Sequence, residues 1–188
     1  MKVAVVWSSP NSGGLTASAK EHFLAGLTRA GAGIEEIPLN RMKIEHCTAC
    51  GSGWGVCRSE GRCWKKDDFQ QIYQKLTEAD GIIWVTAVYW HDATEQMKAF
   101  LDRLRRCETA HNGYLAGKRC ILAACAGGTG LGAVECLHQM EEALKHMGMR
   151  AYDRISVIRY NKDYILPAIE TAGEVYAQRL ETGFDMQY

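Results

Sequence analysis

Short apolar runs alternate along the chain with longer segments in which apolar residues recur every three or four positions. Runs of this length are typical of buried strands, and they cover residues 2–7, 34–38, 81–85, 118–125 and 151–158. The helical spacing is typical of amphipathic helices, and it covers residues 15–30, 69–76, 92–106, 131–147 and 161–176. Strands that alternate with helices in this way predict a parallel sheet with helices on both faces.

Polar residues mark where several of these helices begin. Asp67 and Gln70 have the spacing of a capping box, as do Asp92 and Glu95. Asn161 is a suitable cap for the last helix. Five strands joined by helices fit the doubly wound α/β architecture, in which ligands bind beyond the carboxyl ends of the strands. The loops after the first, third and fourth strands are therefore the candidate binding loops.

The length of 188 residues predicts a single domain, 1–188, with an irregular Gly- and Cys-rich insertion at about 45–66. The formal net charge is zero, with 22 basic and 22 acidic residues and no run of like charges. This balance argues against nucleic-acid and membrane-surface partners. No apolar stretch approaches the ~18 residues of a membrane span, and the N-terminus reads as a strand rather than a signal peptide. We therefore expect a cytoplasmic protein.

The first candidate loop is short, rich in hydroxyl groups and glycine, and runs directly into a helix. Unpaired amides and the positive end of the helix dipole favour a phosphate there, even without a Lys or Arg side chain. The Gly-Lys-Ser/Thr ending of a Walker loop is missing, and an ordinary capped turn is the alternative interpretation. The residues that we expect to bind a cofactor here are Ser9, Asn11, Ser12, Gly14, Leu15 and Thr16.

The other two candidate loops carry aromatic residues and glycines. Two adjacent aromatics beyond a buried strand can border a flat ring, and packing beneath the next helix is the alternative. Gly128, Gly130 and Ala133 match the dinucleotide pattern G-x-G-x-x-A, but that pattern belongs after the first strand of a Rossmann unit. We interpret these glycines as a place where the backbone approaches a ligand closely. The residues expected to bind the cofactor here are Thr86, Ala87, Val88, Tyr89, Trp90, Ala126, Gly127 and Gly128.

Four of the eight cysteines fall within 17 residues, spaced C-x2-C-x6-C-x5-C with glycines between them. Thiolates bind zinc ions and iron–sulfur clusters, so the candidate metal ligands are Cys47, Cys50, Cys57 and Cys63. The six-residue gap fits no common spacing, and the alternative is a set of reduced thiols that pack the loop or pair under oxidation. The other cysteines are interpreted as small core residues: Cys107, Cys120, Cys125 and Cys136.

Taken in order, the loops resemble those of the NADPH-dependent FMN reductase and flavodoxin-like superfamily. Residues 8–16 (SSPNSGGLT) are similar to its Gly-Ser-Pro-Arg-x-x-Gly-Asn-Thr loop, and residues 86–91 (TAVYWH) to its Ser-Pro-Val-Tyr-Phe/Trp-Gly segment. Residues 96–103 (QMKAFLDR) resemble its Gln-Leu-Lys-Ala-Phe-Ile-Asp-Arg helix. The cysteine-rich loop is most similar to that of the iron–sulfur flavoprotein subgroup, which runs C-x2-C-x2-C-x4–7-C.

The resemblance implies a flavodoxin-like three-layer sandwich with a five-stranded parallel sheet in the order 2-1-3-4-5. It also implies bound FMN, NAD(P)H as reductant, a flavin, quinone or other small molecule as electron acceptor, and a homodimer or higher homo-oligomer. An iron–sulfur cluster in the cysteine loop is a second candidate cofactor. Because the flavin carries the chemistry, no catalytic acid–base residue is expected. Two alternatives stay open: a non-enzymatic electron carrier between proteins, and a zinc-stabilised binding module without flavin.

Overall fold

The structure, a computed structural model, describes residues 1–111 and 113–183. Its main sheet consists of the strands β1 (Lys2–Ser8), β2 (Gly33–Pro38), β3 (Gly81–Tyr89), β5 (Arg119–Ala126) and β6 (Arg150–Ile158). They lie in the order β2-β1-β3-β5-β6, and every neighbouring pair is parallel. This is the predicted order 2-1-3-4-5, which is confirmed.

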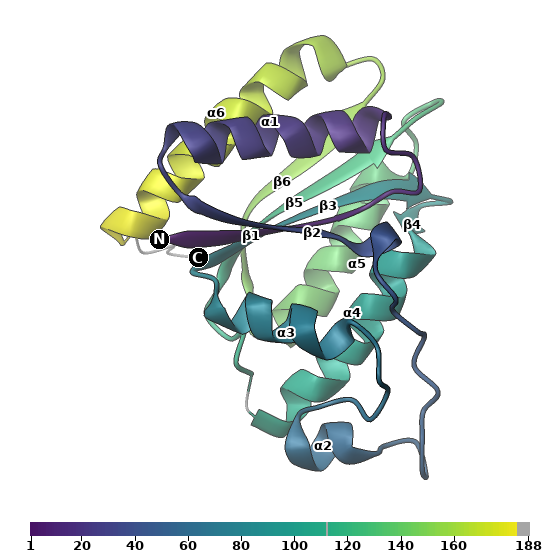
Figure 1. Ribbon diagram of the computed structural model, residues 1–188. Coiled ribbons are helices and arrows are strands. Elements are labelled where there is room, and N and C mark those ends of the chain that lie inside the picture. Colours follow the sequence, from purple (N-terminus) through teal and green to yellow (C-terminus); the bar gives the residue numbers. More distant parts are fainter. Residues whose placement is uncertain (112, 184–188) are drawn as a thin grey trace.

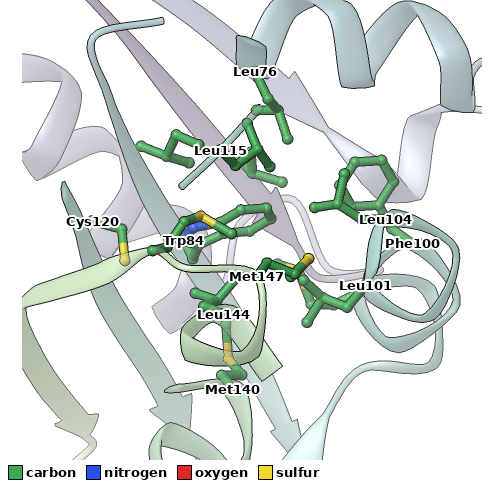
Figure 2. Packing of buried hydrophobic residues seen from close by; sticks show 14 of the residues in the cluster. Leu76, Trp84, Phe100, Leu101, Leu104, Leu115, Cys120, Met140, Leu144 and Met147 are labelled. Atoms are coloured by element: carbon green, nitrogen blue, oxygen red, sulfur yellow. The ribbon is translucent and has the colours of Figure 1, made fainter. Parts of the chain in front are cut away.

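Helices cover both faces of the sheet (Figure 1). One face carries α1 (Leu15–Arg29) and α6 (Lys162–Thr182), and the other carries α3 (Phe69–Glu78), α4 (Glu95–Glu108) and α5 (Ala133–His146). A separate buried cluster fills the layer on each side of the sheet. On the α3–α5 side, the fully buried Trp84 of β3 packs among leucine, phenylalanine and methionine side chains (Figure 2). The predicted three-layer sandwich is therefore confirmed.

Helix α6 belongs to the core because it crosses α1 very closely and reaches the sheet. A Cβ atom added to Gly26 of α1 would lie 2.0 Å from the carbonyl oxygen of Glu170 in α6. Only a glycine therefore allows this crossing. On the same helix, the buried Tyr176 hydroxyl donates to the Arg119 carbonyl oxygen at 2.7 Å and accepts from the Ile82 amide at 3.0 Å. These bonds fix α6 to the start of β3 and β5.

Strand β3 extends beyond the predicted segment and turns back into a short antiparallel strand, β4 (Asp92–Ala93). The two residues at the turn, Trp90 and His91, have positive φ values of 47° and 68°. Positive φ at both central residues is the geometry of a tight two-residue hairpin. The sequence pattern did not predict this hairpin, which projects Trp90 from the carboxyl edge of the sheet.

The helix caps differ from the predicted ones. The proposed cap Asp92 lies in β4, so that prediction is wrong; Thr94 caps α4 instead, its Oγ1 accepting a hydrogen bond from the Met97 amide at 3.2 Å. The capping box at Asp67 is also wrong, because Asp68 is the residue before α3. The Asp67 carboxylate accepts only a long hydrogen bond of 3.4 Å from the Phe69 amide and is held mainly by a distant arginine. Asn161 does precede α6, but its side chain bonds the end of β6 rather than the helix.

The predicted Gly- and Cys-rich insertion contains only a short helix, α2 (Val56–Glu60), which follows the 3-10 turn η1 (Leu39–Arg41). In Figure 1, α2 lies beside the far end of α4, away from the sheet. A second 3-10 turn, η2 (Thr109–His111), follows α4. Within the described residues, no helix is both long and apolar enough to cross a bilayer.

Candidate functional site

The three predicted binding loops meet at one edge of the sheet. Ser8 at the end of β1 is in register with Thr86 of β3, and Thr86 is in register with Ala124 of β5. Strand β2 lies on the other side of β1, so the winding direction reverses between β1 and β3. This is the switch point at which doubly wound sheets bind their ligands.

The first loop leaves the N-terminus of α1 open. The N-cap residue is Gly14, and no side chain among the described residues caps the helix. The loop is shaped by its own side chains: the Asn11 Oδ1 accepts from the Gly13 amide at 3.0 Å, and the Ser9 Oγ accepts from the Asn11 amide at 3.2 Å. Because the first amides of a helix have no partner within it, they are available to an anion here.

The predicted phosphate ligands differ in exposure. Asn11 and Ser12 are exposed, Gly14 and Leu15 are half-buried, and Ser9 and Thr16 are buried. The Asn11 side chain also packs against Gly14, where an added Cβ would lie 2.9 Å from the Asn11 Nδ2. A dianion could therefore reach the amides and the exposed side chains directly. The hydroxyl of Ser9 is buried and hydrogen-bonds the backbone of Asn11, so its main role is to fix the conformation of the loop.

The second and third loops enclose a cavity of about 500 Å³. This volume lies within the usual range of small-molecule sites, roughly 300–1,000 Å³. The lining residues are Val88, Tyr89, Trp90, His91, Ala126, Gly127, Thr129 and Leu131. Five of them were predicted to bind the cofactor, whereas His91, Thr129 and Leu131 were not, although they belong to the same two loops.

Trp90 forms an exposed wall of this cavity. It is 94% exposed and Tyr89 is 50% exposed, so neither is packed beneath a helix, which was the alternative interpretation. The predicted residues Thr86, Ala87 and Gly128 do not line the cavity. Thr86 is fully buried, and its Oγ1 accepts from the Thr94 amide at 3.3 Å. Its side chain therefore supports the hairpin that carries Trp90.

A chain of buried hydroxyls ties this hairpin to the first loop. The Ser8 hydroxyl donates to the Asn40 Oδ1 at 2.8 Å and shares a short hydrogen bond with the Thr94 hydroxyl. On the other side, Gly132 packs against the hairpin turn, where an added Cβ would lie 2.8 Å from the His91 Cα. Ser8, Asn40 and Thr94 were not predicted, because only the folded chain brings their side chains together.

The four predicted metal ligands lie together at a second place. Cys47, Cys50, Cys57 and Cys63 all line one small cavity of about 20 Å³. Cys107 of α4 lines it too, together with Thr48, Trp64, Lys65, Arg103 and Arg106. The other cysteines, Cys120, Cys125 and Cys136, are buried in the core as predicted. Cys107 is also buried, but the sequence did not indicate that it joins the loop thiols.

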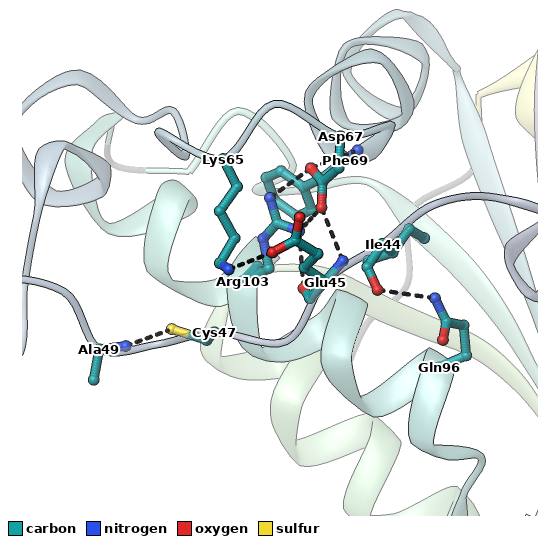
Figure 3. Close-up of polar contacts among 9 residues, drawn as sticks. All are labelled: Ile44, Glu45, Cys47, Ala49, Lys65, Asp67, Phe69, Gln96 and Arg103. Atoms are coloured by element: carbon teal, nitrogen blue, oxygen red, sulfur yellow. Dashed lines mark hydrogen bonds and ion pairs between the residues drawn. The ribbon is translucent and has the colours of Figure 1, made fainter.

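Arg103, which lines this cysteine pocket, forms a buried ion pair with Asp67 (Figure 3). The side chains of Arg103 and Asp67 are 2% and 0% exposed, and the Arg103 Nη2 donates to the Asp67 Oδ1 at 2.8 Å. Burial by itself would raise the pKa of Asp67, but hydrogen bonds from Arg103 and from the Glu45 amide outweigh it and lower that pKa. Arg103 also donates to the Glu45 carbonyl oxygen at 2.9 Å and lies 4.3 Å from the centre of the Phe69 ring. The pair therefore fastens the start of the cysteine loop to α4.

The pocket has the donor chemistry of a thiolate-bound metal centre. Five thiols line it, together with the cations Lys65, Arg103 and Arg106, of which Lys65 and Arg103 are paired with Glu45 and Asp67. Burial raises the pKa of Cys107 to about 12. A metal ion that binds this thiol would displace its proton. Within residues 1–111 and 113–183, no group of three or more His, Cys, Asp or Glu side chains is already arranged to hold a metal ion. The thiols would thus have to turn toward a common centre.

Several curated relatives of this chain are named iron–sulfur flavoproteins. One from Archaeoglobus fulgidus is 30% identical over 118 residues, which is 63% of this chain and 51% of that protein. One from Methanocaldococcus jannaschii is 34% identical over 135 residues, which is 72% of this chain and 66% of that protein. The chain thus spans between about half and two thirds of the length of these relatives.

Solved structures share the fold at lower sequence identity. An NAD(P)H:quinone oxidoreductase from Methanothermobacter marburgensis aligns over 98% of this chain and 99% of its own, with a TM-score of 0.70 and 17% identity. A flavodoxin from the domain Archaea aligns over 96% of this chain and 99% of its own, with a TM-score of 0.64 and 18% identity. These likenesses confirm the flavodoxin-like fold. The sequence profile that matches residues 1–162 is that of the NADPH-dependent FMN reductases, and the chain belongs to this family.

Proposed function

We propose that this protein binds FMN non-covalently and passes electrons from NAD(P)H through it to a small-molecule acceptor such as a flavin or a quinone. Family membership supports FMN as the cofactor and an oxidoreductase activity. The observation that carries the proposal is the meeting of an uncapped helix N-terminus with an aromatic-walled cavity of about 500 Å³ at the switch point of the sheet.

The phosphate of FMN would lie at the start of α1. There the amides of Ser12, Gly14 and Leu15, together with the side chains of Asn11 and Ser12, would hold it, while the buried Ser9 hydroxyl keeps the loop in shape. Charge-assisted hydrogen bonds contribute about 1.5–3 kcal/mol each, so several amides hold a dianion without a cationic side chain. The helix dipole adds to this attraction.

The flavin ring would lie in the cavity between the hairpin and the loop after β5. Val88, Ala126 and Gly127 would bring backbone close to the ring, and Trp90 would border it. Bound FMN supplies the redox chemistry, in which it takes up a hydride from NAD(P)H and returns electrons to the acceptor. The protein orients the ring and limits its contact with water, so its own residues need not move a proton.

Removing the indole at Trp90 should alter the flavin environment without altering the fold. We expect Trp90→Ala to change the rate of flavin reduction by about two- to tenfold, the range of one aromatic contact. Because Trp90 is 94% exposed, the free energy of unfolding should change by at most about 0.5 kcal/mol. Tyr114→Ala, an exposed aromatic at the opposite edge of the sheet, is the control. Equal reduction rates and equal flavin fluorescence in all three proteins would remove Trp90 from the flavin site.

Steady-state oxidation of NADH and NADPH tests the proposed activity. With FMN and a quinone present, we expect oxidation of at least one nicotinamide that requires the protein, the FMN and the acceptor together. If FMN-loaded protein oxidises neither nicotinamide, the enzyme proposal fails. In that case the non-enzymatic electron carrier becomes the better account.

That second candidate draws on the cysteine pocket. Five thiols that line one pocket, and relatives named iron–sulfur flavoproteins, support an iron–sulfur cluster as a second redox group, held by thiols of this pocket. A chain with FMN and a cluster is suited to one-electron exchange with a protein partner. A zinc ion bound by the same thiols would instead be purely structural.

We also propose that the protein works in the cytoplasm as a homodimer or higher homo-oligomer. Trp90 and Leu131 are exposed apolar side chains that line the proposed flavin cavity, and the exposed Val134 follows three residues after Leu131. A second copy that covers them would close the cavity on its open side. Apolar side chains gathered in this way commonly mark an interaction surface.

A further inference from the structure

Five thiols line the cysteine pocket, one more than a tetrahedral zinc ion or a four-cysteine iron–sulfur cluster uses. The fifth, Cys107, does not come from the loop. It lies 44 residues after Cys63, on the well-ordered helix α4. Its position is therefore set by the core, whereas the loop thiols lie in a largely irregular segment.

The face of α4 that carries Cys107 packs against the cysteine loop. Arg103, Arg106 and Cys107 are spaced at i, i+3 and i+4, so they share one side of the helix. Arg106 donates a short hydrogen bond to the Gly53 carbonyl oxygen and lies 4.3 Å from the centre of the Trp54 ring. Arg103 likewise donates to the Glu45 carbonyl oxygen at 2.9 Å. Two arginines thus hold the loop at two points beside the cavity that its thiols and Cys107 line together.

A second observation is a buried hydrogen-bond donor without an acceptor, on a residue that lines the same pocket. The Nε of Arg103 is buried and has no hydrogen-bond partner in the described part of the chain, although both Nη atoms of this side chain are bonded. A buried donor without an acceptor destabilises the folded chain. Because Arg103 lines the cavity, an anionic sulfur held there would supply the missing acceptor.

We propose that Cys107 is a ligand of a thiolate-bound metal centre in this pocket, together with three of the four loop cysteines. The centre then joins the loop to α4, and one loop thiol is left outside it. This explains why the loop can carry a C-x2-C-x6-C-x5-C spacing that fits no common four-cysteine site. The inference does not depend on FMN binding, so either can fail without the other.

Metal analysis of serine variants tests this proposal. Wild-type protein and each variant are purified without air, and iron, acid-labile sulfide and zinc are measured per chain. Loss of an outer-shell partner lowers metal affinity by roughly tenfold or more. Loss of a ligand should lower the affinity at least as much, so we expect Cys107→Ser to contain less metal per chain than wild type. Cys136→Ser is the matched control, because Cys136 is a buried cysteine of α5 outside the pocket, and it should keep the wild-type metal content. Iron with sulfide identifies a cluster, and zinc alone identifies a single ion.

Four further variants keep the proposal testable even if Cys107→Ser does not fold. With Cys107 as a ligand, one of the single serine variants at Cys47, Cys50, Cys57 and Cys63 should retain the metal and its absorption spectrum. If all four lose it, the loop thiols fill the site and the proposal is overturned. Wild-type metal content in a folded Cys107→Ser variant would overturn it as well, and so would wild-type protein that contains neither iron nor zinc.

Discussion

A carboxylate introduced at Ser12 should weaken FMN binding by about ten- to a hundredfold while leaving the fold intact. Ser12 is exposed and stands two residues before the N-cap of α1. An aspartate there would face the FMN phosphate and offset roughly one charge-assisted hydrogen bond, about 1.5–3 kcal/mol. The same carboxylate interacts favourably with the helix dipole, by at most about 1 kcal/mol. Ser12→Asp should therefore bind FMN more weakly without unfolding more easily.

The affinity is measured by titrating FMN into flavin-free protein and monitoring the quenching of flavin fluorescence. All variants compared should have the same metal content. A double variant, Ser9→Ala with Thr16→Ala, should lose affinity as well, since it removes the loop hydroxyl of Ser9 and the hydroxyl of Thr16 in the first turn of α1. Thr28→Ala is the control, because its hydroxyl bonds the Leu24 carbonyl oxygen near the other end of α1. If Ser12→Asp and the double variant both bind FMN as tightly as wild type, the phosphate does not lie at the start of α1.

Loss of the Arg103 guanidinium should lower the free energy of unfolding by about 3–5 kcal/mol, because it leaves the Asp67 carboxylate buried without its partner. Arg103→Met keeps much of the side-chain volume and removes the charge. The control Lys98→Met breaks a surface pair of the same helix, in which Lys98 and Asp102 are each about half exposed. That change should cost at most about 1 kcal/mol.

Urea unfolding of the two variants measures this difference. Adding Asp67→Leu to Arg103→Met should recover part of the loss, since a buried pair replaced by apolar side chains is often neutral. Equal stability of wild type and Arg103→Met at neutral pH would contradict the description of this pair as the link between the cysteine loop and α4.

The contribution of the pair should depend on pH in a definite direction. The pKa of Asp67 is lower in the folded chain than in the unfolded one. The stabilisation is therefore fully present above the unfolded value of about 3.9, and it is lost as the pH falls through the folded value. The stability gap between wild type and Arg103→Met should shrink below about pH 4.

The sequence predicted the parallel strands and their binding edge because both follow from local patterns, whereas the strand order came from the resemblance to flavodoxin-like proteins. Buried parallel strands read as apolar runs, and a hydroxyl- and glycine-rich loop before a helix marks an anion site wherever it occurs. The interpretation of residues 86–91 also located the cavity wall, since the aromatics directly follow a buried strand.

The remaining features depend on contacts between distant residues. Asp67 has the sequence spacing of a cap, but the guanidinium of Arg103, 36 residues away, competes successfully for its carboxylate. Asp92 resembles a cap in the same way, and the two-residue hairpin that displaces it is too short to leave a periodic signal. Cys107 joins the loop thiols only because α4 passes behind the loop. The spacing of residues along the chain does not predict this contact.

The absorption spectrum of protein purified without air, with the bound flavin identified and counted, tests the central claim most directly. The account predicts the spectrum of a bound flavin, FMN at about one per chain, and bleaching of the visible flavin bands when NADH or NADPH is added. A colourless protein that takes up no FMN when the cofactor is supplied at micromolar concentration would contradict it.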